Sequence, residues 1–117
     1  MFLKTDSKIF QKFPDLTLGV IVAKGIDNAK KHTAITQLVN GACAQQKSKF
    51  AREDLSGNVV IKAWRDAYRN FGADPEKYPC SIEALLKRII AGKEIPRINT
   101  LVDLYNYFSI RNIIPIG

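Results

Sequence analysis

The chain has 117 residues, of which 46% are hydrophobic and 25% are charged. These values are typical of a soluble globular protein, and the length predicts one domain over residues 1–117. The 18 Lys and Arg residues outnumber the 11 Asp and Glu residues, which gives a net charge of +7. Both halves of the chain are basic and neither carries a basic tail, so we expect a salt-dependent attraction to polyanions rather than a disordered nucleic-acid-binding arm.

Few residues of the chain could hold a metal or act as nucleophiles. Cys43 and Cys80 belong to no CxxC pair, and the single histidine, His32, leaves too few soft ligands for zinc. No glycine-rich phosphate loop and no nucleophile elbow occurs. The start lacks the apolar core of a signal peptide, and no stretch approaches the roughly 18 apolar residues of a membrane span. We therefore expect a cytoplasmic protein without metal, cofactor or membrane partner.

The first third of the chain predicts a helix and a strand. The spacing of the apolar residues in "SKIFQKF" favours a short helix that begins after Asp6 as its N-cap and ends before Pro14. The next stretch, "LTLGVIVAKG" (16–25), is rich in β-branched residues and ends on glycine. This composition is typical of a buried strand.

Two further helices are expected over residues 30–52 and 58–72. The second has a continuous apolar face and ends at Gly72. On its opposite side lie Lys62, Arg65 and Arg69. These cations form either an ordinary solvated face or a stripe that follows the phosphates of a nucleic acid.

The last third predicts two more helices. Residues 81–92 have an apolar stripe, with Ser81 as the expected cap and Gly92 as the stop. Thr100 and Asp103 have the spacing of a capping box for a helix whose core face contains Leu101, Leu104, Tyr105 and Phe108. The closing "NIIPIG" is typical of the start of a strand. The expected fold is α+β, with about five helices packed on a small, incomplete sheet, and with an uncovered apolar face that favours self-association.

Three segments of the second half together resemble a known family. They are "YPCSIEALLKR", "IPRINTLVDLYN" and "SIRNIIPIG". Their order and spacing are similar to those of the B3/B4 domain of the bacterial phenylalanyl-tRNA synthetase β subunit, and more closely to free-standing B3/B4-domain proteins. The resemblance covers a little under half of the chain. In the synthetase, this domain hydrolyses tyrosine wrongly attached to phenylalanine tRNA, which corrects the imperfect discrimination of the synthetic site.

The resemblance implies a role for Asn106, which corresponds to an asparagine that lines the editing pocket. From its position alone, Asn106 is either such a ligand-binding amide or a helix residue that bonds a neighbouring backbone group. Gly117 stands where the synthetase has a pocket histidine, and the family domain continues further, so the chain is expected to be truncated at its C-terminal end.

The resemblance implies a free-standing relative of the editing domain that binds aminoacyl-tRNA and hydrolyses mischarged tRNA. The alternatives are a non-catalytic module that binds tRNA or a protein, and an inactive domain fragment. Charge and position alone select Arg65, Arg69 and Arg97 as residues that would contact tRNA phosphates.

Overall fold

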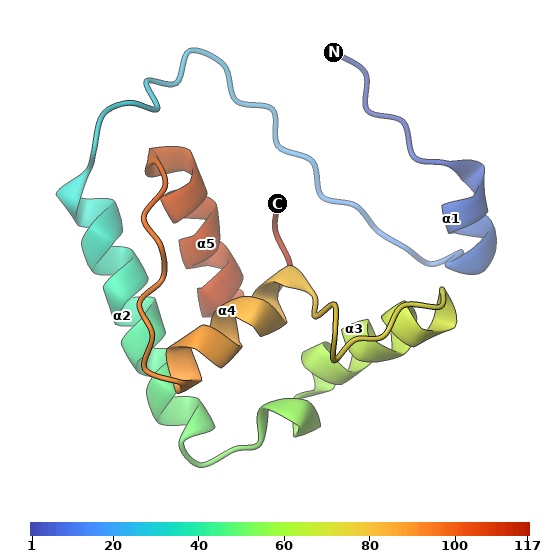
Figure 1. Ribbon diagram of the computed structural model, residues 1–117. Helices are drawn as coiled ribbons and strands as arrows, with labels where there is room; N and C mark the ends of the chain where they lie inside the picture. The colour runs from blue at the N-terminus through green and yellow to red at the C-terminus, as the bar shows by residue number, and fades with distance from the viewer.

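A computed structural model describes residues 1–117 and contains helices and connecting segments only (Figure 1). None of the helices combines the length and the apolar composition needed to cross a bilayer. The elements, in chain order, are α1 (Ser7–Lys12), α2 (Thr33–Phe50), the short 3-10 helix η1 (Leu55–Gly57), α3 (Val59–Asn70), α4 (Ser81–Ile90) and α5 (Thr100–Asn112).

The expected α+β fold with a small sheet is wrong, because the structure has no strand. The segment at residues 16–25 is extended, but it is exposed rather than buried as its composition predicted, and it crosses the edge of the molecule apart from other extended chain (Figure 1). Residues 17–26 make no backbone hydrogen bond. A strand exists only where a neighbouring strand pairs with its amides and carbonyls, and no extended segment of this chain pairs with residues 16–25. The closing segment after α5 is not a strand either.

Several helix ends follow the local chemistry that the sequence predicted. Asp6 caps α1 as predicted. Gly72 and Gly92 follow α3 and α4 with φ of 87° and 71°, the left-handed conformation that glycine adopts without steric cost. The caps predicted at residues 81 and 100 are wrong by one residue.

Those two helices begin at the preceding residue. Cys80 is the N-cap of α4 and makes no capping hydrogen bond through its side chain. Asn99 is the N-cap of α5, and its side-chain oxygen accepts from the amide of Val102 at 2.9 Å. Asparagine is a better N-cap than threonine, and the helix begins one residue earlier than predicted. Asp103 therefore does not occupy the capping-box position that its spacing from Thr100 predicted.

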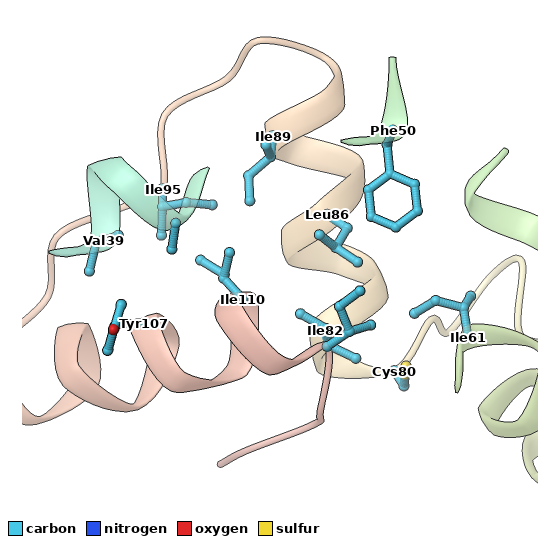
Figure 2. Close-up of a cluster of buried hydrophobic side chains, with 12 residues drawn as sticks. Val39, Phe50, Ile61, Cys80, Ile82, Leu86, Ile89, Ile95, Tyr107 and Ile110 are labelled. Atoms are coloured by element: carbon cyan, nitrogen blue, oxygen red, sulfur yellow. The ribbon is translucent and has the colours of Figure 1, made fainter. Parts of the chain in front are cut away.

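The core lies where α2, α4 and α5 meet (Figure 2). Ile82 and Leu86 of α4 and Ile110 of α5 are fully buried there, and Ile61 extends the core to α3. The apolar stripe expected on residues 81–92 supplies this face of α4. Full burial of such side chains stabilises the fold by about 1.5–3 kcal/mol each.

Helix α5 does not bury the face that its apolar pattern predicted. Tyr107 and Ile110 point into the core, whereas Leu101 and Phe108 are 41% and 45% exposed. The prediction that these two residues face the core is therefore wrong. The helix has two apolar faces, and the one that packs against α2 and α4 is the one with Tyr107 and Ile110.

Candidate functional site

Two adjoining hollows lie along α2 and the segment that connects α4 to α5. Their volumes are about 530 Å³ and 440 Å³. Thr36 and Arg97 line both hollows, so together they form one groove, which we call the Arg97 groove. The groove lies between elements far apart in sequence, and only the packing of the chain brings its two walls together.

Arg97 is held at the centre of this groove by α2. Its Nη2 atom donates to the side-chain oxygen of Asn40 at 2.8 Å and to the carbonyl of Thr36 at 3.3 Å. Its Nη1 atom lies 3.7 Å from a carboxylate oxygen of Asp103. The guanidinium group thus fastens the segment before α5 to α2, and one face of it remains available to the groove.

The groove has a surplus of positive charge. Its lining contains Lys31, Lys47, Lys93 and Arg97 against Glu94 and Asp103. None of the three lysines makes an ion pair, since the salt bridges of the chain involve other side chains. Unpaired ammonium groups beside a hollow can bind the anionic oxygens of a ligand without first breaking an internal bond.

A glycine brings one of these lysines close to the end of α4. A Cβ atom at Gly92 would lie 3.8 Å from the Nζ atom of Lys47. The ammonium group is therefore close to the C-terminal end of the helix, where the partial negative charge of the last carbonyls favours a cation. This brings the ammonium group of Lys47, which belongs to the α2 wall, close to the opposite wall that carries Lys93.

Neither cysteine has the lowered pKa of an activated nucleophile. Burial raises the pKa of the Cys43 thiol, which lines the groove, although the charge of Arg97 acts in the opposite direction. Burial also raises the pKa of Cys80, and this outweighs the backbone hydrogen bonds at the start of α4. Both groups stay protonated at neutral pH, and a thiol is a far weaker nucleophile than a thiolate.

The structure does not bring the three candidate arginines together. Arg65 binds Glu83 through two nitrogens and lies 2.9 Å from Glu76, which makes it part of a largely buried ion-pair network. Arg69 forms an exposed pair with Asp66 at 3.0 Å. Arg97 alone lines a groove. Contact of any of the three with RNA stays a prediction, but only Arg97 lies among unpaired cations.

Asn106 is half-buried on α5 and does not line the Arg97 groove. Its side chain makes no hydrogen bond, either to a neighbouring backbone group or to another side chain. The neighbouring Asn112, in contrast, donates to the carbonyl of Phe108 at 2.9 Å. One of the two alternatives for Asn106 was a hydrogen bond to nearby backbone, and this bond is absent. The side-chain amide of Asn106 therefore remains free to bind another group.

Sequence reasoning missed Lys31, Lys47 and Lys93. Each lies in a polar stretch that resembles an ordinary charged surface, and up to 62 positions separate them along the chain. No local pattern connects them.

Comparison with protein families gives a match in the second half of the chain. Residues 63–117 match the family of the B3/4 domain. No curated protein and no solved structure gives a match to the chain. The matched range contains most of α3, all of α4 and α5, and the Arg97 side of the groove. The match to the B3/4 domain family thus covers a little under half of the chain, and this part is similar to that family.

Proposed function

We propose that the chain binds tRNA, charged or uncharged, with the phosphate backbone lying in the Arg97 groove. The observation that carries this proposal is the set of three unpaired lysines around Arg97 in a chain of net charge +7. The B3/4 family match supports tRNA as the polyanion, since this domain occurs in a tRNA synthetase. Cytoplasmic translation is the process in which such a protein would act.

The arrangement suits phosphate contact better than base recognition. Lysine ammonium groups bind phosphate as point charges, and Arg97 adds a planar donor that is already oriented by Asn40 and Thr36. The groove offers no Phe, Tyr or Trp side chain on which a base could stack, and His32 is its one aromatic ring. Binding should therefore depend steeply on salt and weakly on nucleotide sequence.

The test is a salt series of tRNA affinity, measured by fluorescence anisotropy with labelled tRNA. We expect the double variant Lys47→Gln/Lys93→Gln to bind more weakly and to reduce the slope of log K against log salt by about two. The matched control is Lys4→Gln/Lys62→Gln, which removes the same charge at two exposed positions outside the groove. Equal slopes for the two double variants would contradict binding in the groove.

A second function, hydrolysis of mischarged aminoacyl-tRNA, is favoured by Asn106. A half-buried amide without an internal partner can donate to a ligand oxygen and accept from another group. Ester hydrolysis of this kind needs no enzyme nucleophile, because a positioned water and the terminal ribose can supply the reacting groups. The protonated state of both cysteines is compatible with that route.

A further inference from the structure

Residues 16–23, with the sequence LTLGVIVA, are extended and apolar, and we call them the apolar segment. No backbone hydrogen bond joins residues 17–26 to the rest of the chain. The side chains of Leu18, Val20 and Val22 are 50%, 58% and 59% exposed, and that of Ile21 is 95% exposed. Because successive side chains of an extended chain point to opposite faces, both faces of the segment and both edges of its backbone are open to a partner.

The chain is anchored on both sides of the apolar segment. Before it, the ring of Phe13 makes an edge contact with the ring of Phe71 next to α3, with the ring centroids 6.3 Å apart. After it, the side-chain oxygen of Asn28 accepts from the amide of Leu101 at the start of α5, at 2.8 Å. The segment crosses the edge of the molecule between these anchors (Figure 1). Backbone that is already held extended loses less conformational entropy when a strand adds to it than a free chain would lose.

The composition of the apolar segment favours such an addition. Four of its residues are β-branched, namely Thr17, Val20, Ile21 and Val22. These residue types suit the pleated surface of a sheet, and an apolar edge with free amides and carbonyls is a template for pairing with another chain. Pro14 before the segment and Gly25 after it, with a φ of 70°, limit the stretch that can pair. Since this chain has no strand of its own, the pairing strand must come from another molecule.

The segment lies in the part of the chain that exposes the most surface. The accessible area of the chain is 8582 Å², whereas a compact monomer of 13.1 kDa exposes about 6,400 Å². None of residues 1–32 is buried, so the excess of about 2,200 Å² lies mainly there. A standard interface covers about 800 Å² on each partner, which is roughly a third of this excess. The surface available around the segment is therefore sufficient for a stable dimer.

The charges at the two ends of the segment select a second copy of this chain as the partner. The segment itself carries no charge, so two copies can meet here in spite of their net charge of +7. Asp15 precedes it and Lys24 follows it, and neither makes an ion pair within the chain. Antiparallel pairing brings Asp15 of each copy beside Lys24 of the other, whereas parallel pairing would bring like charges together.

A twofold axis at Val20 gives a register that suits both faces of the pair. On one face it places Val20 opposite the same residue of the other copy and Leu18 opposite Val22. On the other face it places Ile21 opposite Gly19, where no side chain competes with the larger residue. We propose that the chain forms a homodimer by antiparallel pairing of two apolar segments, centred on Val20.

Sedimentation equilibrium of proline variants tests the pairing. We expect the wild-type chain to sediment with twice the mass of 13.1 kDa at micromolar concentration. The amides of Val20 and Ile21 point to opposite edges, so either Val20→Pro or Ile21→Pro must remove a donor from the paired edge. We expect that variant to raise the dissociation constant at least about a hundredfold. Neither variant removes a backbone hydrogen bond of the monomer.

The matched control for the proline variants is Leu3→Pro. It also replaces an exposed apolar residue that makes no backbone hydrogen bond, but it lies outside the apolar segment and should leave the dimer intact. Hydrogen exchange gives a second readout, because the amides on the paired edge, every second one in the segment, should be protected in the dimer.

Charge variants test the antiparallel orientation. Lys24→Asp lowers the net charge by two units, from +7 to +5, which by itself would favour association. In the antiparallel pair it nevertheless places two acids together at each end, so we expect the dissociation constant to rise about tenfold. A mixture of Lys24→Asp with Asp15→Lys should regain the wild-type affinity, because opposite charges then meet at both ends. Lys4→Asp makes the same charge change outside the segment and should not weaken the dimer.

Circular dichroism establishes that each variant keeps its helices, as substitution of exposed residues should allow. A monomeric wild type would overturn the proposal. So would a dimer that both Val20→Pro and Ile21→Pro leave unchanged, or a Lys24→Asp variant that associates as tightly as the wild type.

Discussion

The Nη2 atom of Arg65 lies 2.5 Å from the Oε1 atom of Glu83, a carboxylate with no solvent-exposed side-chain surface. The same oxygen is 2.9 Å from the ammonium group of Lys87. Arg65 comes from α3 and Glu83 from α4, so this network ties the two helices together beside the core. Hydrogen bonding to Glu83 also raises the pKa of Arg65, which keeps the guanidinium charged. Arg65 is thereby engaged in the fold itself.

Replacing Glu83 should destabilise the chain severely. Glu83→Gln removes the charge that compensates Arg65 and Lys87, and we expect a loss of about 3 kcal/mol in the free energy of unfolding. Chemical denaturation followed by circular dichroism measures it. Asp66→Asn, which breaks the exposed pair with Arg69, serves as the control and should cost less than about 1 kcal/mol. Similar losses of unfolding free energy for both variants would contradict the prediction that the buried ion pair stabilises the fold more than the exposed one does.

The same carboxylate predicts a loss of stability in acid. Burial raises the pKa of Glu83, but the hydrogen bonds and charges of Arg65 and Lys87 outweigh it and leave the pKa below its ordinary value of 4.5. Because the pKa is lower in the folded state, the stabilisation is complete above the unfolded value and is lost as the pH falls through the folded value.

Denaturation curves over a pH series measure this effect. The contribution of Glu83 should be constant from neutral pH down to about pH 5.5 and should fall below about pH 4.5. Glu83→Gln should have a flatter acid limb than the wild type. Parallel acid limbs would mean that Glu83 does not titrate with unfolding.

Gln46 stabilises the C-terminal end of α5 from α2. Its amide nitrogen donates to the carbonyl of Ile110 at 2.9 Å, while its own buried oxygen has no partner. Gln46→Leu removes the unpaired oxygen but leaves the buried carbonyl without a donor, so we expect a loss of about 1–3 kcal/mol. Gln46→Glu should cost more at neutral pH, because it places a carboxylate against carbonyls. Thermal melts rank the two variants against the wild type, and a wild-type melting temperature for Gln46→Leu would rule out this hydrogen bond as a stabilising contact.

The two thiols should react slowly with thiol reagents in the folded chain. Burial raises the pKa of both cysteines, and Cys80 is also inaccessible within the core. We expect Cys43 to be labelled first, at a rate below that of a free thiol, and Cys80 only on unfolding. Labelling kinetics of Cys43→Ser and Cys80→Ser with and without denaturant separate the two. Rapid labelling of Cys80 in the native chain would contradict its place in the core.

The proposed role of Asn106 in the hydrolysis of aminoacyl-tRNA can be tested by substitution. If its amide orients the aminoacyl group, Asn106→Ala should abolish the release of tyrosine from mischarged phenylalanine tRNA while leaving tRNA affinity unchanged. Asn112→Ala, which removes an exposed amide six residues further along α5, is the matched control. If neither wild type nor variant releases tyrosine faster than the buffer does, hydrolysis is excluded and tRNA binding stands as a separate question.

The local chemistry of the sequence determined the helices and most of their ends. Asp6, Gly72 and Gly92 act through contacts within a few residues, so their roles could be predicted without tertiary structure. The stripe of α4 likewise predicted its buried face. The B3/4 family match was also visible in the order of three short segments.

Only the tertiary structure determines which apolar surfaces pack against other parts of the chain. The extended segment at residues 16–25 has the composition of a strand, but pairing depends on a second segment that local sequence cannot supply. Helix α5 has two apolar faces, and packing against α2 and α4 chose the one with Tyr107 and Ile110. Ile113 ends that helix at a φ of 53°, a conformation that β-branched residues avoid and that its burial offsets here. The Arg97 groove arose in the same way, because its lysines meet only after the helices pack.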